Sequence, residues 1–204
     1  MTASKKAFGA IAVIFLILLL DQIIKIWVKT HFALGEEVRI ADWFRIRFIE
    51  NPGMAMGIEV FGKLFLTIFR IVASVAIAYY IYLLIKNKFK FGYILLVSMI
   101  FAGAVGNIFD SIFYGVIFSE STPMHIATLF PPEGGYSSWL HGEVVDMFYF
   151  PLFNFNWPSW MPWIGGSEFE FFRYIFNLAD ASISVGIIVL LLFFRKTLSL
   201  SFEK

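Results

Sequence analysis

Residues 8–28 read FGAIAVIFLILLLDQIIKIWV, a run in which Asp21 and Lys25 are the only charged residues. A helix needs about 20 mostly apolar residues to cross a bilayer, and this run is long enough. Lys5 and Lys6 precede it, as basic residues precede a cleavable signal peptide, but no small-x-small cleavage site follows it. We therefore expect a retained membrane helix rather than a leader.

Three further segments have the same apolar character, at residues 64–85, 91–113 and 171–194. The whole chain is 59% hydrophobic and 15% charged, whereas a soluble domain carries about 25% charged residues. Composition and segment length together predict a membrane protein with four transmembrane helices.

The basic residues outside the four segments indicate how the chain is oriented. Residues 114–170 contain no lysine or arginine, whereas the tails and the turn between the second and third segments are basic. By the positive-inside rule both termini are then cytoplasmic, and two outer loops lie at about 29–63 and 114–170. The predicted fold is a single all-α membrane domain, 1–204, with a small extracytoplasmic β element. The basic residues in question are Lys5, Lys6, Lys86, Lys88, Lys90, Arg195, Lys196 and Lys204.

The two outer loops have different patterns. Residues 38–48 include apolar side chains that alternate with Arg45 and Arg47, which predicts short amphipathic strands. The second loop is rich in proline and tryptophan, and indole rings favour the headgroup level of a bilayer. We expect this loop to lie along the outer membrane surface, anchored by Trp139, Trp157, Trp160 and Trp163.

Composition also excludes several kinds of site. The net charge of +1 and the absence of any run of like charges give no basis for a nucleic-acid partner. The chain has no cysteine, which excludes disulfides, thiolate metal sites and a cysteine nucleophile. Its three histidines lie far apart in the sequence, and no pair has metal-ligand spacing. We expect neither a metal nor another cofactor.

Polar residues inside the spans lie toward the outer ends of three helices. They are Asp21, Lys25, Asn107, Asp110, Asn177 and Asp180. At 1.5 Å per residue, Asp180 is expected roughly 12–14 Å below the outer end of a helix that begins at residue 171. A charge in that position is costly, and polar groups within spans commonly mark functional sites.

Each polar group also has a structural interpretation. Asp21 and Lys25 are spaced i,i+4 and can form an intrahelical ion pair. Asn107 and Asp110 can hydrogen-bond between helices. Asp180 has no cation within one turn, which favours a functional role, whereas Asp146 reads from composition alone as a solvated loop carboxylate. The glycines and alanines at 102–106 predict close helix packing.

Five motifs in order resemble those of the lipoprotein signal peptidases, the type II signal peptidases of bacterial inner membranes. They are DQIIK (21–25), NPGMAMG (51–57), GNIFD (106–110), VVDM (144–147) and FNLAD (176–180). Each motif alone is weak, but their order and their spacing to the four spans agree with the family over nearly the whole chain.

The resemblance implies an intramembrane aspartic endopeptidase whose catalytic pair is Asp146 and Asp180. Its substrates would be prolipoproteins carrying a diacylglyceryl-modified cysteine, cut on the N-terminal side of that cysteine. Cyclic peptide inhibitors of the family would occupy the pair, and a monomer is enough for the chemistry. The supporting residues implied are Asn51, Gly53, Asn107, Asp110, Asn177, Ala179, Asp21 and Lys25.

This chain departs from the family pattern at several positions. Met56 and Met147 stand where phenylalanine is usual, and Ser111 stands where the family has an arginine. Arg70 and Arg173 are candidates to supply the missing charge. Residues 115–142 form an apparent insertion, which we expect to lie over the outer face of the site.

Two close carboxylates cannot both ionise readily, so one of the pair would hold a proton while the other activates a water molecule. The sequence does not indicate which aspartate is protonated. An alternative is a small proton-coupled transporter or relay subunit that uses Asp21, Asp110 and Asp180. A membrane subunit without chemistry is a third possibility.

Overall fold

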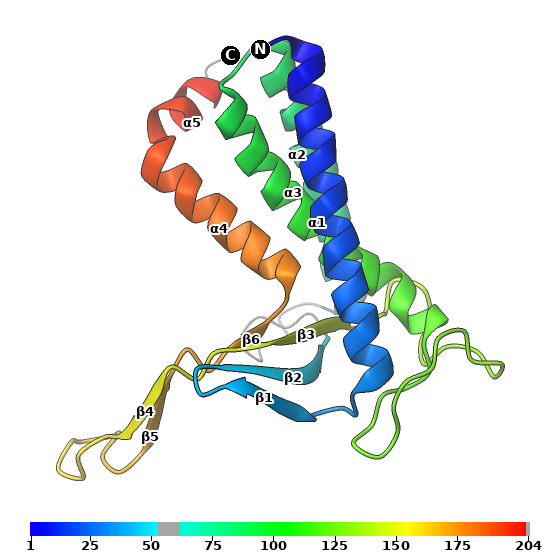
Figure 1. Ribbon diagram of the computed structural model, residues 1–204, viewed down its shortest axis with the longest axis vertical. Coiled ribbons are helices and arrows are strands. Elements are labelled where there is room, and N and C mark those ends of the chain that lie inside the picture. Colours follow the sequence, from blue (N-terminus) through cyan, green and yellow to red (C-terminus); the bar gives the residue numbers. More distant parts are fainter. Residues whose placement is uncertain (53–61, 203–204) are drawn as a thin grey trace.

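The computed structural model describes residues 1–52 and 62–202 as a helical bundle that stands on a small β-sheet (Figure 1). The helices are α1 Ala3–His31, α2 Lys63–Lys86, α3 Phe91–Ile117, α4 Leu178–Phe193 and α5 Arg195–Phe202. The strands are β1 Glu37–Ala41, β2 Phe44–Asn51, β3 Val144–Tyr149, β4 Phe153–Asn156, β5 Glu168–Phe171 and β6 Ile175–Phe176.

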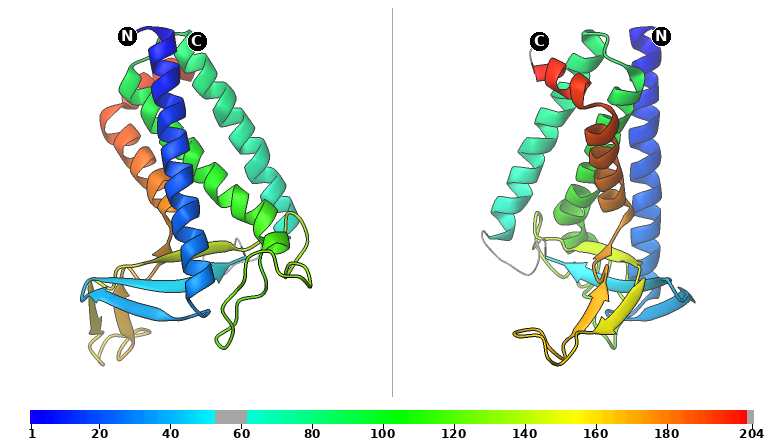
Figure 2. Two further views of the ribbon diagram at one scale, coloured as in Figure 1. Left: turned by 45° about the vertical axis from the view of Figure 1, so that its right-hand side comes forward. Right: turned by 90° about the vertical axis from the view of Figure 1, so that its left-hand side faces the viewer.

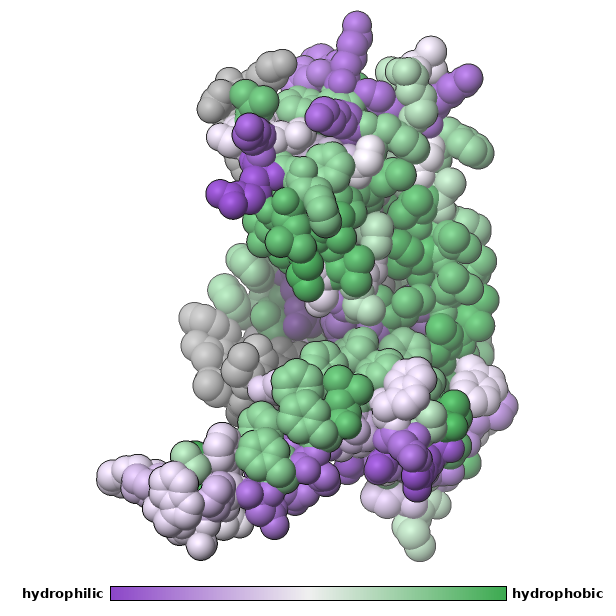
Figure 3. Space-filling view, turned by 60° about the vertical axis from the view of Figure 1, so that its left-hand side comes forward, coloured by the Kyte–Doolittle hydropathy of each residue, from purple (hydrophilic) through white to green (hydrophobic). Residues whose placement is uncertain are grey.

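Helix α3 is the centre of the bundle and packs against α1, α2 and α4. In the described residues three helices, α1, α2 and α3, are long and apolar enough to cross a membrane. Helices α4 and α5 meet at a 95° bend, and the pair counts as a fourth candidate span if it is taken as one. On the face drawn in Figure 3, most of the bundle surface between the hydrophilic end and the sheet is apolar, as expected for helices that face lipid.

The four-stranded sheet β1-β2-β3-β6 lies across the end of the bundle opposite the N-terminus (Figure 2). The predicted strands within residues 38–48 are confirmed as the antiparallel pair β1 and β2. The second outer segment holds more structure than the loop predicted for it. Strand β3 pairs with β2 and β6, and β4 and β5 form a separate hairpin that projects from the sheet.

The predicted bounds of the fourth helix are wrong at its start. Residues 171–176 hold the last residue of β5 and the whole of β6, and α4 begins only at Leu178. Asp180 therefore lies in the first turn of the helix, and the depth expected from a start at residue 171 does not apply. Asn177 is the residue that ends the strand and caps the helix.

Small residues bring α3 and α4 into close contact, as the sequence predicted. A side chain at Gly103 would place its Cβ 2.3 Å from the carbonyl oxygen of Ala179. On α4, a Cβ at Gly186 would lie 2.7 Å from the side chain of Ile100. The first contact matters more for the site, because Ala179 belongs to the turn that carries Asp180.

Substitution Gly103→Ala is expected to destabilise the fold by about 2–3 kcal/mol, because the added methyl group overlaps a backbone oxygen that cannot move without shifting α4. Thermal unfolding of the detergent-purified protein measures this. Gly62→Ala is the control, since its Cβ would meet no atom of the described residues within 4 Å. Equal stability of the two variants would show that the α3–α4 contact is not close.

Candidate active site

Asp146 lies in the middle of the buried strand β3. Val144, Val145, Asp146 and Met147 are all buried, and the side chain of Asp146 is only 2% exposed. Its partner across the β2–β3 pairing is Ile49. The carboxylate accepts hydrogen bonds from Nδ2 of Asn177 at 2.6 Å and from Nδ2 of Asn51 at 3.3 Å. The composition-based view of Asp146 as a solvated loop residue was therefore wrong.

Asp180 is held at the N-terminus of α4 by a capping box. The side-chain oxygen of Asn177 accepts from the backbone N–H of Asp180 at 2.9 Å, and the carboxylate of Asp180 accepts from the backbone N–H of Asn177 at 3.4 Å. Nδ2 of Asn107 also donates to Asp180 Oδ1 at 2.7 Å. The carboxylate thus satisfies the free N–H groups of a helix start, while α3 fixes its orientation.

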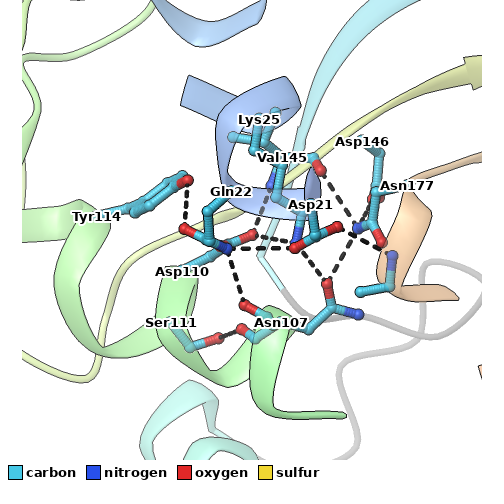
Figure 4. Close-up of polar contacts among 12 residues, drawn as sticks. Asp21, Gln22, Lys25, Asn107, Asp110, Ser111, Tyr114, Val145, Asp146 and Asn177 are labelled. Atoms are coloured by element: carbon cyan, nitrogen blue, oxygen red, sulfur yellow. Dashed lines mark hydrogen bonds and ion pairs between the residues drawn. The ribbon is translucent and has the colours of Figure 1, made fainter. Parts of the chain in front are cut away.

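One amide group connects the two carboxylates. Nδ2 of Asn177 faces Oδ1 of Asp146, and Asn177 caps the helix that carries Asp180 (Figure 4). The same amide nitrogen donates to Oδ1 of Asn107 at 3.0 Å. A strand and two helices therefore meet at Asn177, which is fully buried. This arrangement sets the positions of Asp146 and Asp180 relative to each other.

Asp146 is an acid whose environment favours the protonated form. Burial is the main cause, and the negative charge of Asp180 adds to it, so that the pKa of Asp146 is raised to about 7. Hydrogen bonds from Asn51 and Asn177 and the charge of Lys25 act in the opposite direction. The negative charge of Asp180 therefore favours a proton on Asp146.

The predicted ion pair between Asp21 and Lys25 is confirmed and is part of a larger cluster. The ammonium of Lys25 lies 2.9 Å from Asp21 Oδ2 and 2.8 Å from Asp110 Oδ2. It also donates to Oδ1 of Asn107 at 2.8 Å. All three charged groups are buried. Lys25 of α1 thus joins α1 to α3 through its ion pair with Asp110. A buried charge on either helix would be costly without such a partner.

Asp21 extends this cluster to α4. Its Oδ1 accepts from the backbone N–H of Ala179 at 2.9 Å. Gly106 allows the approach, because a Cβ there would lie 2.8 Å from Asp21 Oδ2 and 3.2 Å from the methyl group of Ala179. The expected supporting residues of α1, α3 and α4 thus come together. Gly53 lies outside the described residues.

The sequence reasoning missed Gln22 and Tyr114. Nε2 of Gln22 donates to Asp110 Oδ1 at 2.9 Å, and Oε1 of Gln22 accepts from the hydroxyl of Tyr114 at 3.0 Å. Both side chains are polar groups at the outer ends of apolar helices. That placement is the signal that could have identified them, since such groups need partners inside the protein.

Ser111 does not take over the contacts of a charged residue, although the family pattern has an arginine at this position. Its hydroxyl donates to the carbonyl oxygen of Asn107 in its own helix at 3.0 Å. Of the two arginines considered as substitutes, Arg70 of α2 is half-buried and Arg173 is exposed. Among the described residues, neither forms an ion pair with Asp146 or Asp180.

The apparent insertion, residues 115–142, packs around the C-terminal end of α3. Backbone hydrogen bonds join Leu140 to Ile112 and Gly142 to Ser111. At α2, the hydroxyl of Thr67 donates to the carbonyl oxygen of Leu140 at 3.2 Å. Other hydrogen bonds of this segment include internal ones and ones to Leu34 and Glu143. Among the described residues, none reaches Asp146 or Asp180. Its contacts thus support the frame of the site.

Comparisons with known proteins agree with this arrangement. Residues 13–196 match the family model described as signal peptidase (SPase) II. The chain is 54% identical over 193 residues to a lipoprotein signal peptidase of Porphyromonas gingivalis, covering 93% of this chain and 84% of that protein. It is 35% identical over 208 residues to a lipoprotein signal peptidase of Amoebophilus asiaticus, covering 98% of this chain and 84% of that protein.

Two solved structures share the fold. Both are described as a bacterial membrane enzyme structure obtained by the in meso method. One aligns with a TM-score of 0.59 at 22% identity and covers 92% of each chain. The other aligns with a TM-score of 0.61 at 23% identity and covers 92% of this chain and 88% of the other.

Substitution Lys25→Met is expected to destabilise the protein by about 3–5 kcal/mol, because it leaves the carboxylates of Asp21 and Asp110 buried without their cation. Adding Asp110→Asn to that variant should recover part of the loss, since one uncompensated charge is then removed. Thermal unfolding measures both effects, and exposed Lys5→Met is the control. A fully stable Lys25→Met variant would contradict the role given to this cluster.

Proposed function

The chain belongs to the signal peptidase II family, and we propose that Asp146 and Asp180 are the catalytic pair with which it acts. The family processes prolipoproteins, so the protein is an aspartic endopeptidase that removes the signal peptide on the N-terminal side of the lipid-modified cysteine. Family membership supports a signal peptidase that processes prolipoproteins, whereas the bond that is cut and the roles of individual residues are our proposal.

One observation supports the assignment most directly. Asp146 comes from a buried strand and Asp180 from a helix start, yet Asn177 lies next to both and the charge of Asp180 raises the pKa of Asp146. Asp146 is buried and Asp180 is partly exposed, and two carboxyl groups with such unequal environments are the arrangement that aspartic peptidases use. Neither residue forms an ion pair with a lysine or arginine within the part of the chain that is described.

In the proposed mechanism Asp146 holds the proton and Asp180 is ionised. Asp180 takes a proton from a water molecule as that water attacks the scissile carbonyl carbon. Asp146 gives its proton to the carbonyl oxygen, and a neutral tetrahedral diol forms. When the C–N bond breaks, Asp180 transfers its proton to the leaving nitrogen, while Asp146 recovers a proton from a hydroxyl of the diol. Both carboxyl groups thus return to their starting states.

The amide side chains around the pair have positioning roles in this proposal. Asn107 orients Asp180 through its 2.7 Å hydrogen bond, and Asn51 and Asn177 orient Asp146. The charge of Arg70 stabilises the ionised carboxylate and the negative charge that develops on the carbonyl oxygen. Cyclic peptide inhibitors of the family would bind where the substrate backbone approaches the pair.

The substrate class explains where the pair lies. A prolipoprotein carries two acyl chains that can remain in the bilayer while the peptide bond beside its cysteine reaches the site. We propose that the protein resides in the bacterial inner membrane with the sheet at the outer surface and both termini in the cytoplasm. In Figure 3 hydrophilic surface is visible in a hollow between the apolar helices and the sheet, where such a substrate could approach from the lipid.

The relay alternative has no support beyond the charged cluster itself. A proton path would need polar groups along the full length of the helices. Residues 8–20 of α1 have only apolar side chains and glycine, and residues 94–106 of α3 contain Ser98 as their only polar side chain. The ionisable groups of these two helices instead gather beside the sheet and at the opposite basic end.

Substitutions Asp146→Asn and Asp180→Asn are each expected to lower cleavage by at least about 10³-fold, because neither variant retains both a base and a proton donor. The assay follows the size shift of a purified diacylglyceryl-modified prolipoprotein on a gel. Asp42→Asn is the matched control, since it makes the same chemical change at an exposed turn. Near-normal cleavage by either folded variant would overturn the assignment.

Stability provides an independent readout of Asp146. Its pKa in the folded protein, about 7, lies above the ordinary value of 3.8, so the wild type loses stability as the pH rises from about 4 to about 7. Asp146→Asn removes this loss. Its melting temperature should exceed that of the wild type by ~3–8 °C at about pH 8, and the difference should shrink at about pH 5. A difference that is independent of pH would contradict the raised pKa.

A further inference from the structure

A second polar region lies at the end of the bundle opposite the sheet, where α4 bends by 95° into α5. A cavity of about 700 Å³ opens beside this bend. Its cationic lining comes from two elements, with Lys90 before α3 and Arg195 and Lys196 at the start of α5. The hydroxyls of Thr197 and Ser199 complete the polar side. None of these groups takes part in the chemistry at Asp146 and Asp180.

The charge at this end of the molecule is uniformly positive in the described residues. The cations are Lys5, Lys6, Lys86, Lys88, Lys90, Arg195 and Lys196, whereas residues 1–20, 79–109 and 181–202 contain no aspartate or glutamate. Three of these cations, all exposed, line one cavity, so an anionic group placed there would be attracted by all three. The region therefore has the electrostatic character of an anion site.

The frame around the cavity is built by specific contacts. The ammonium of Lys6 donates to the carbonyl oxygens of Lys88 and Phe89, which fixes the turn that carries Lys90. The ring of Phe194, at the bend, lies against Tyr93 with centroids 6.0 Å apart. These contacts hold the two cationic elements in place before any ligand binds.

Helix α5 is fixed at its other end as well. The hydroxyl of Tyr80 hydrogen-bonds that of Tyr93 at 2.6 Å and also that of Ser201. These hydrogen bonds hold α5 against α2 and α3, and the bend therefore keeps Arg195 and Lys196 beside the end of α4.

The other side of the cavity is apolar and faces the surrounding lipid. Leu192 and Phe193 line it, and both are largely exposed on the outer surface of α4. The cavity thus joins a cationic site to an acyl-chain surface at the end of a membrane helix. Figure 3 shows the same change from apolar helix surface to hydrophilic residues at this end.

We propose that this cavity binds the headgroup of an anionic phospholipid. The phosphate lies among Lys90, Arg195 and Lys196, with hydrogen bonds from the two hydroxyls, and the acyl chains run along Leu192 and Phe193. A free phosphate ion would use the same cations but not the apolar side. The bound lipid would neutralise the cationic group and stabilise the bend between α4 and α5.

The test is native mass spectrometry of the full-length protein in detergent, titrated with phosphatidylglycerol or with phosphatidylcholine. The wild type should bind phosphatidylglycerol preferentially. The double variant Arg195→Gln/Lys196→Gln should weaken that binding about tenfold or more, since each basic residue contributes about 1 kcal/mol toward an anionic lipid. The double variant Lys5→Gln/Lys86→Gln is the matched control, because it loses the same charge from exposed positions outside the cavity.

Three results would overturn the proposal. The first is an equal loss of phosphatidylglycerol binding in the control variant, which would mean that the net charge of the protein alone attracts the lipid. The second is equal binding of the two lipids by the wild type. The third is displacement of phosphatidylglycerol by equimolar inorganic phosphate, which would identify an ion site rather than a lipid site.

Prolipoprotein cleavage in phosphatidylcholine serves as the folding control, because the cavity lies at the other end of the bundle from the catalytic pair. If the double variant is inactive and unfolded, the lipid preference is measured instead with Lys90→Gln, which removes the cation on the other side of the cavity. Loss of phosphatidylglycerol preference in an active Lys90→Gln protein supports the site, and an unchanged preference contradicts it.

Discussion

The structure depends on one buried ammonium group. Lys25 has no exposed surface, and its charge is balanced by Asp21 and Asp110 at hydrogen-bond distance. Burying such a group without partners would cost several kcal/mol, so the positions of α1 and α3 are coupled to each other. Because Asp21 also binds the backbone of Ala179 and Lys25 binds Asn107, this constraint extends to the start of α4. The catalytic geometry that we propose is thus set by a cluster that does not itself react.

The two proposed catalytic aspartates obtain different environments from different elements. Asp146 is enclosed in a strand that is buried in the sheet, and burial favours its protonated form. Asp180 lies at a helix N-terminus, where backbone and amide N–H groups face it. The same geometry lowers stability at neutral pH, as is common for sites that hold functional charge. The lipid site proposed at the opposite end would neutralise the cations that line the cavity there.

The sequence predicted local features well and long-range features poorly. The helix at residues 8–28 follows from the length of the apolar run, and the ion pair of Asp21 and Lys25 follows from their i,i+4 spacing; both are found. Strand β3 was read as a loop because its burial arises from pairing with β2 and β6, which no local pattern shows. The start of α4 was misplaced because apolar residues at 171–176 fit a helix as well as a strand. Asn177 followed three residues later by Asp180 was the capping signal for the true start.

The central claim, that Asp146 holds a proton beside an ionised Asp180, is tested most directly by infrared difference spectroscopy of the lipid-reconstituted protein between about pH 5 and about pH 9. The carbonyl band of a protonated carboxylic acid is followed through the titration. We expect a component that titrates near pH 7, is missing in Asp146→Asn, and moves to lower pH in Asp180→Asn because the neighbouring negative charge is removed. A component near pH 7 that is unchanged in Asp146→Asn would contradict the account.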